Sequence, residues 1–298
     1  MQSNHVSVLL NESVEGLAIH EGDVIVDGTL GAGGHSAEIA RRFGNAVQIV
    51  GFDLDAHALV IAKETIEKAG GKLTSIHDTF AHIEHACVAH GIPKINKALF
   101  DLGVSSMELG ASGRGFSFMH DEPLLMTLKN PITSDTLTAG HVVNGTSESE
   151  LADIIYQLGE ERYSRMIAKA IVTARRKKRI ETTFELKEIV WDAVPRGYRN
   201  GKIHPATKTF QALRMYVNDE LGAIEQGLRG AWNMLETNGR IAVITFHSLE
   251  DRVVKNIFKE FSKSNGTLIN KKPIVPTREE VLKNRRSRSA KLRIIQKN

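Results

Sequence analysis

The sequence predicts an α/β fold in which a doubly wound, mostly parallel sheet is interrupted by a helical insert. A strand rich in β-branched residues is predicted at 24–27 and is followed by a glycine-rich turn. Strand and helix patterns then alternate to residue 101. Polar turns and amphipathic helix patterns, the latter at 148–158, 162–179 and 184–193, occupy 113–205. Strand patterns return at 239–246 and 291–295. We therefore predict one discontinuous domain, 1–112 with 206–298, and an inserted helical domain at 113–205.

The glycine-rich turn after the first strand is the clearest sign of a ligand site. Glycines let a backbone approach a ligand closely, and the helix that follows offers unpaired N–H groups. A dinucleotide fingerprint would end in glycine, where this chain has Ser36. Asp27 at the strand end suits a cationic nucleoside such as S-adenosylmethionine, whereas it would repel a pyrophosphate. A tight turn without a ligand is the alternative.

Three further strands end in residues that suit the same ligand. They are predicted at 47–53, 73–80 and 97–101 and end in Asp53, Phe80 and Asp101. In open α/β sheets, ligands bind beyond the carboxyl ends of the strands, so these side chains should converge with Asp27. We expect Asp53 to hold ribose hydroxyls. Phe80 lies either against an adenine face or in the core as an ordinary aromatic residue.

Composition is typical of a cytoplasmic protein. The 298 residues can bury a sizeable core, and Cys87 is the only cysteine, which excludes an intramolecular disulfide and a cysteine zinc site. The twelve histidines are scattered, so we predict no metal. Residues 1–10 lack a basic stretch followed by a long apolar one, and no run of about 18 apolar residues occurs, so we expect neither secretion nor membrane spanning.

Charge divides unevenly along the chain and indicates a polyanionic substrate. Residues 1–110 have a net charge of −7 and residues 111–298 a net charge of +11. The densest basic stretches are 175–179 and 278–298. Lys and Arg fields collect phosphates, so nucleic acid is the leading candidate, and a solvated helix face is the alternative for either stretch alone.

Seven ordered motifs resemble the MraW family, the bacterial small-subunit ribosomal RNA methyltransferases H. The motif Asp27-Gly28-Thr29-x-Gly31-x-Gly33-Gly34-His35-Ser36 is the longest in the first half of the chain. The others begin at His5, Asp101, Arg114, His204, Phe246 and Arg286 and cover the chain from end to end.

The resemblance implies a Rossmann-like methyltransferase fold and transfer of a methyl group from S-adenosylmethionine to the N4 amine of a cytosine in the decoding region of small-subunit rRNA. The family's cofactor contacts correspond to Gly33, Gly34, His35, Asp53, Phe80, Asp101 and Glu108. Glu108 departs from the usual glutamine. The segment 123–128 departs as well, since Leu125 and Thr127 replace an acid and an arginine.

Transfer to cytosine requires a hydrogen-bond acceptor beside the amine, and we assign this role to Asp101. The inserted domain is expected to recognise the substrate, and we predict RNA contacts at Arg175, Lys177, Lys208, Arg214, Asn218 and His247. Two structural alternatives are an ion pair of Arg214 with Glu220 or Asp219, and a helix start at 247–249 capped by Ser248.

The alternative functions are an amino-methyltransferase that acts on another RNA or on DNA, and a non-catalytic ribosome-assembly factor that retains the fold. An oxidoreductase ranks third. We expect the small ribosomal subunit rRNA as partner, and a homodimer is one candidate oligomeric state.

Overall fold

The computed structural model describes residues 7–103 and 112–298. Contacts divide the chain into Met1–Gly103 with Leu221–Asn298, which we call the sheet unit, and Val104–Glu220, which we call the helical unit. Helix α11 (Ala206–Val217) packs against the other helices of the helical unit, chiefly α7 (Glu148–Gly159). The predicted boundary at residue 206 therefore lies one helix ahead of the division that the contacts give.

The sheet unit is built on seven strands in the order β3-β2-β1-β4-β5-β7-β6. Their bounds are β1 Val24–Asp27, β2 Gln48–Phe52, β3 Leu73–Ile76, β4 Ile95–Asp101, β5 Leu235–Thr245, β6 Gly266–Leu268 and β7 Lys291–Lys297. The first five strands pair in parallel, and β7 runs antiparallel to both neighbours. This confirms the doubly wound, mostly parallel sheet. Strand order reverses between β1 and β4, the position at which open α/β sheets bind ligands.

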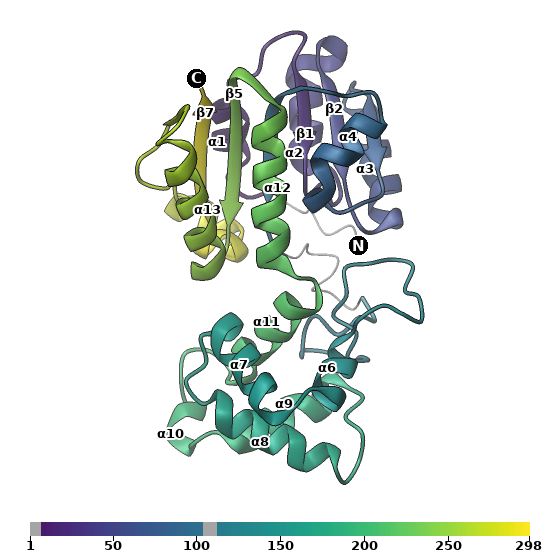
Figure 1. Ribbon diagram of the computed structural model, residues 1–298, viewed down its shortest axis with the longest axis vertical. Coiled ribbons are helices and arrows are strands. Elements are labelled where there is room, and N and C mark those ends of the chain that lie inside the picture. The colour runs from purple at the N-terminus through teal and green to yellow at the C-terminus, as the bar shows by residue number, and fades with distance from the viewer. Residues whose placement is uncertain (1–6, 104–111) are drawn as a thin grey trace. The chain divides into compact units, whose positions relative to one another are not determined.

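Helices cover both faces of this sheet, as Figure 1 shows for α12 in front of the strands. Alternate side chains of the strands point to opposite faces, so Val26 joins one apolar cluster and Ile25 the other. The first cluster includes side chains of α4 (Ile83–Ala89), α12 (Glu220–Met234) and α13 (Ser248–Phe261). The second includes those of α1 (Leu10–Leu17), α2 (Gly34–Phe43) and α3 (Ala56–Lys68). Shorter elements are η1 Gly44–Ala46, η2 Phe80–His82, α14 Arg278–Lys283 and η3 Arg285–Ser289.

The helical unit has its own apolar core. Besides α7 and α11 it contains α6 Ala139–Gly145, α8 Ser164–Arg175, α9 Thr183–Ala193 and α10 Arg196–Arg199. Hydroxyl side chains start three of them: Thr138 accepts a hydrogen bond from the backbone of His141, Ser147 accepts one from that of Glu150, and Thr182 forms a capping box with Glu185. Among the helices of the described residues, none combines the length and the apolar character that crossing a membrane requires.

Candidate active site at the carboxyl edge of the sheet

The turn between β1 and α2 carries three of the predicted cofactor residues. Gly33 has a φ of +79°, and a Cβ atom there would lie 3.1 Å from the backbone of Ala62. A Cβ atom on Gly34 would overlap the hydroxyl group of Ser7. The backbone conformation of Gly33 therefore favours glycine, whereas a side chain at position 34 would require the Ser7 hydroxyl to move. The next residue, His35, is buried in the first turn of α2.

Asp27, at the end of β1, holds this turn in shape. One carboxylate oxygen accepts the hydroxyl of Ser36 at 2.7 Å, and the other accepts the backbone N–H of Thr29 at 3.2 Å. Burial, partly offset by these two hydrogen bonds, raises the pKa of Asp27 to about 6. Asp27 is only 2% exposed, so its carboxylate supports the turn from within, and its attraction for a cationic ligand stays a prediction.

Asp101 ends β4 beside this turn, and its backbone N–H donates to the Thr29 hydroxyl at 2.6 Å. Its Oδ1 atom is buried and has no hydrogen-bond partner among the described residues. Burial, and then the charges of Asp27 and Glu250, raise the pKa of Asp101 to about 8. A buried carboxylate oxygen without a partner is costly, and such groups are common at functional sites.

The Nδ1 atom of His35 is the ring nitrogen that lies toward Asp101. Its Nε2 lies 3.1 Å from the carbonyl oxygen of Val8, and because a carbonyl only accepts, Nε2 must carry a proton. The Nδ1 atom lies 3.7 Å from Oδ2 of Asp101. Nδ1 is therefore the nitrogen that can exchange a proton with this side of the site.

Asp53 joins the turn to β2. Its carboxylate accepts the backbone N–H of Gly31 at 2.9 Å and that of Asp55 at 2.8 Å. The side chain is half-buried, and an ionised carboxylate only accepts hydrogen bonds. The structure thus brings Gly33, Gly34, His35, Asp53 and Asp101 together at one edge of the sheet.

Phe80 corrects one prediction. Strand β3 ends at Ile76, and Phe80 instead begins η2, because the Thr79 side chain caps this turn by accepting the N–H of Ala81. The half-buried ring packs edge-to-face on Phe100 with centroids 5.5 Å apart. Phe80 also lies beside Gly28 of the glycine turn. This position is compatible with both predicted roles, core packing and contact with adenine.

Two residues that complete this edge were not predicted from the sequence. Thr29 ties the turn to β4 through Asp101, and Ser36 satisfies Asp27. The available signal was the pair of hydroxyl residues that flank the glycines, since such side chains often bond to nearby backbone and carboxylates.

Glu108 lies outside the described residues. The other departure from the family pattern, 123–128, belongs to the helical unit, where Thr127 is buried. The next residue, Leu128, donates its backbone N–H to the side chain of Asn218 at 2.8 Å.

Four of the predicted RNA contacts belong to the helical unit and make structural bonds. The Asn218 amide also donates to the carbonyl of Met126 at 2.8 Å. Arg214 forms a two-pronged ion pair with Glu220 at 2.7 and 2.8 Å, which is one of the two predicted structural alternatives. Arg175 donates to the carbonyl of Val143, and Lys208 to that of Glu160, both at 2.8 Å. Lys177, by contrast, is exposed.

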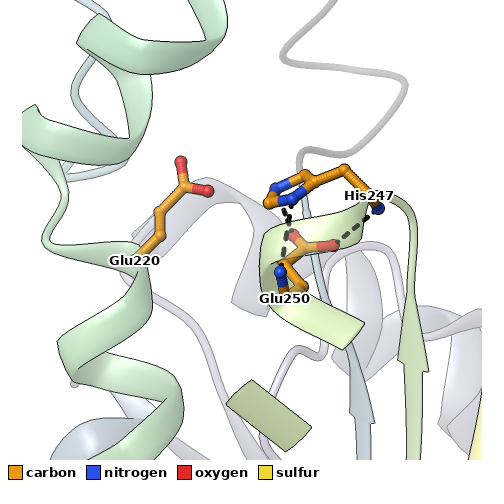
Figure 2. Close-up of side chains that lie close together, drawn as sticks. All are labelled: Glu220, His247 and Glu250. Carbon is orange, nitrogen blue, oxygen red and sulfur yellow. Dashed lines mark hydrogen bonds and ion pairs between the residues drawn. The ribbon is translucent and has the colours of Figure 1, made fainter. Parts of the chain in front are cut away.

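His247, the remaining candidate, begins α13 as its N-cap, a place that the sequence analysis gave to Ser248. Its ring accepts the backbone N–H of Glu250, and the Glu250 carboxylate accepts the backbone N–H of His247 (Figure 2). The same carboxylate accepts the backbone N–H of Phe246 at 2.7 Å. Glu250 itself is 1% exposed. This reciprocal capping box accounts for both side chains structurally.

Comparisons with known proteins identify the family of this chain. The MraW methylase family model matches residues 2–298. Ribosomal RNA small subunit methyltransferase H of Finegoldia magna is 41% identical over 100% of this chain and 99% of its own. The protein of the same name from Sulfurihydrogenibium sp. is 45% identical over 97% and 98%. The structure of an rRNA methylase from Streptococcus thermophilus is 11% identical, with a TM-score of 0.47 over 98% of both chains. The chain belongs to the MraW methylase family, and this membership confirms the predicted methyltransferase class with its S-adenosylmethionine cofactor.

Proposed function

We propose that this protein transfers a methyl group from S-adenosylmethionine to the N4 amine of a cytosine in the decoding region of small-subunit rRNA. The observation that carries the proposal is the half-buried Asp101 carboxylate, whose buried Oδ1 has no hydrogen-bond partner among the described residues, beside a glycine-rich turn. The names of the full-length relatives support the RNA substrate.

The residues at the sheet edge fit the cofactor. Glycines without Cβ atoms let a ligand come close to the backbone of a turn, and the half-buried Asp53 carboxylate is an acceptor suited to ribose hydroxyls. Phe80 offers a half-buried ring beside the turn. We assign Gly33, Gly34, His35, Asp53, Phe80 and Asp101 to this cofactor. When bound, S-adenosylmethionine supplies an electrophilic methyl group.

Asp101 is the group that we assign to the target amine. The lone pair of a cytosine N4 amine is delocalised into the ring, so methylation needs an acceptor that orients an N–H and draws off a proton. Only the ionised carboxylate is purely an acceptor. A cation nearby favours that form and lowers the pKa of Asp101 from about 8. Nδ1 of His35, 3.7 Å from Oδ2, can hold the released proton.

The helical unit is proposed to hold the RNA while the target base leaves its stack, a step that costs a few kcal/mol and least for an unpaired nucleotide. Of the basic candidates there, Lys177 is exposed, whereas Arg175 and Lys208 donate to backbone carbonyls. Of these three residues, Lys177 is therefore the one that we assign to an RNA phosphate.

The test is transfer of labelled methyl from S-adenosylmethionine to small ribosomal subunits that lack the modification, followed by nucleoside analysis of the RNA. The proposal predicts label in N4-methylcytosine. Label in another nucleoside, or in naked RNA or DNA but not in subunits, would contradict the target. No label despite cofactor binding would favour the assembly-factor alternative.

A further inference from the structure

The helical unit has an open cavity of about 220 Å³ that belongs to none of the sites described above. It lies where the end of α7 meets the loop before α8 and the first turn of α8. The side chains that line it combine aromatic, basic, acidic and thioether groups. They include Asp153, Tyr156, Arg162, Tyr163, Arg165 and Met166.

One wall of this cavity is held rigidly. The guanidinium of Arg162 lies over the ring of Tyr163 at 4.7 Å and over that of Tyr198 at 5.1 Å. Beneath it, the fully buried carboxylate of Glu161 accepts the hydroxyl of Tyr198 at 2.6 Å and the backbone N–H of Tyr163 at 2.9 Å. The Arg162 guanidinium is therefore positioned by two tyrosine rings. It would lose little conformational freedom on binding a ligand.

The rest of the cavity offers apolar surface to solvent. Tyr156 is 61% exposed and Met166 is 48% exposed, values that are high for side chains with so much apolar area. A Tyr ring on a helix is a flat platform with few rotatable bonds. Surface of this kind, at the rim of a cavity, marks an interaction site.

Charge indicates which ligand this surface takes. Among residues 7–103 and 112–298, no carboxylate is recorded in an ion pair with Arg162 or Arg165. Two arginines without acidic partners beside an exposed tyrosine suit a phosphate next to a stacked base. Asp153, one helical turn before Tyr156, is exposed and can accept from a base N–H group.

We propose that this cavity binds one unpaired nucleotide of the substrate RNA, with its base on Tyr156 and Met166 and its phosphate at Arg162 and Arg165. The proposal rests on the proposed function, since it takes the substrate to be RNA. It adds a contact at which the helical unit holds a nucleotide other than the methylated one. A base-sized cavity and a rigid, stacked arginine favour a nucleotide over a folded protein surface.

The first experiment measures RNA binding directly. The probe is a fluorescein-labelled single-stranded RNA of about ten nucleotides, a length typical of such sites, followed by fluorescence anisotropy. Tyr156→Ala and Arg165→Ala should each weaken binding about tenfold, because stacking of one base contributes about 1–3 kcal/mol. Tyr156→Phe keeps the ring and should bind like the wild type. Lys202→Ala removes one exposed charge elsewhere in the helical unit and should change affinity less than about twofold.

The second experiment separates this proposal from the proposed function. In methyl transfer to small subunits, Tyr156→Ala and Arg165→Ala should raise KM and leave kcat unchanged, since the cavity binds substrate in the ground and transition states alike. Normal transfer and normal RNA binding by both variants would overturn the cavity proposal and leave the function intact. Wild-type protein that binds the oligonucleotide through Tyr156 but methylates no rRNA would overturn the function and leave the cavity intact.

Two outcomes count directly against the cavity. Wild-type protein that does not bind the oligonucleotide would overturn it, and so would equal losses in Arg165→Ala and Lys202→Ala, which would indicate a general charge effect. Thermal unfolding of each variant guards against misfolding, and the exposure of Tyr156 and Arg165 predicts little change.

Discussion

The candidate residues at the sheet edge and those in the helical unit differ in what their polar atoms contact. At the sheet edge, the predicted residues converge and Asp101 keeps an oxygen without a partner among the described residues. In the helical unit, Arg175, Lys208, Arg214 and Asn218 use their polar atoms to hold their own fold together. Position at the carboxyl end of a parallel strand therefore predicted which side chains lie close together, whereas positive charge did not reveal which side chains bond within their own unit.

The difference has a physical origin. Parallel strands deliver their carboxyl ends to one edge, so each strand-end side chain reaches the same place whatever its neighbours are. A basic side chain on a helix is long and finds the nearest carbonyl or carboxylate, which an isolated sequence pattern does not reveal. The predictions below test this contrast, from the largest expected effect to the smallest.

Removal of the acceptor at the sheet edge should have the largest effect. Asp101→Asn should lower the rate of methyl transfer about a hundredfold or more, because positioned acid–base groups typically contribute 10²–10⁴-fold. Initial rates with small subunits measure this, and circular dichroism checks folding. Glu64→Gln, which removes an exposed acid from α3, is the matched control. A variant with wild-type activity would exclude Asp101 as the acceptor.

In the helical unit the largest effect should be on stability. Arg214→Ala leaves the 11% exposed carboxylate of Glu220 without its two-pronged partner and should lower the free energy of unfolding by about 2–3 kcal/mol. Lys177→Ala should leave stability unchanged, because its side chain is exposed. Urea denaturation of both variants measures the difference. A stable Arg214→Ala with impaired RNA binding would restore Arg214 as a substrate contact.

Glycines in the two units should respond differently to a methyl group. Gly33→Ala, at a φ of +79° and against Ala62, should destabilise the protein by about 1–2 kcal/mol. Gly145→Ala in the helical unit meets open space and should not destabilise it. Thermal unfolding of the two variants measures this contrast. Equal stability would show that the turn after β1 is not strained.

The pH dependence of transfer should follow Asp101. With a pKa of about 8, the carboxylate form grows as pH rises, so kcat/KM should increase about tenfold or more between pH 6 and pH 8. Asp101→Asn should flatten this rise in its residual activity. A pH profile that is already flat in the wild type would contradict the assignment.

The raised pKa of Asp101 also makes folding stability depend on pH, and stability should fall as pH rises, whereas activity should rise. Its pKa is raised from 3.8, so its protonated form favours the folded state, and that stabilisation is lost as pH rises through about 8. Asp27, with a pKa raised to about 6, acts in the same direction at lower pH. Asp101→Asn should therefore be more stable than the wild type above pH 8, as thermal unfolding at pH 6 and pH 9 would show.

The smallest effect concerns the start of α13. His247→Ala removes the N-cap and should destabilise the protein by about 1 kcal/mol, whereas His247→Asn keeps a capping acceptor and should be closer to the wild type. Methyl transfer by each variant, measured well below its unfolding temperature, decides the second role. Normal transfer leaves His247 as a cap, and a loss in folded His247→Asn would show that it also contacts the target base.

Particular residues show where prediction from the sequence ends. The strands and the sheet-edge site followed from local patterns, because alternation and glycine turns are local. Arg214 and Glu220 are six residues apart, a spacing that does not pair within one helix; they meet because α11 ends at Val217 and α12 begins at Glu220.

The start of α13 was misplaced by one residue for a reason distant in sequence. Ser248 and Asp251 have the spacing of a capping box, which favours Ser248 as N-cap. Asp251 instead accepts hydrogen bonds from Arg293 at 2.7 Å and Lys291 at 3.0 Å, both on β7. Glu250 is then the residue that caps, together with His247. The residues next to Ser248 in the sequence do not reveal that Asp251 bonds to Arg293 and Lys291.

Isothermal titration of S-adenosylmethionine into the purified protein tests most directly the claim that the sheet edge is the cofactor site. We predict one binding site per chain, with affinity about tenfold lower in Asp53→Asn, which loses a charge-assisted hydrogen bond, and unchanged in Glu64→Gln. Absence of binding by the wild type, or equal affinity in all three proteins, would contradict the account.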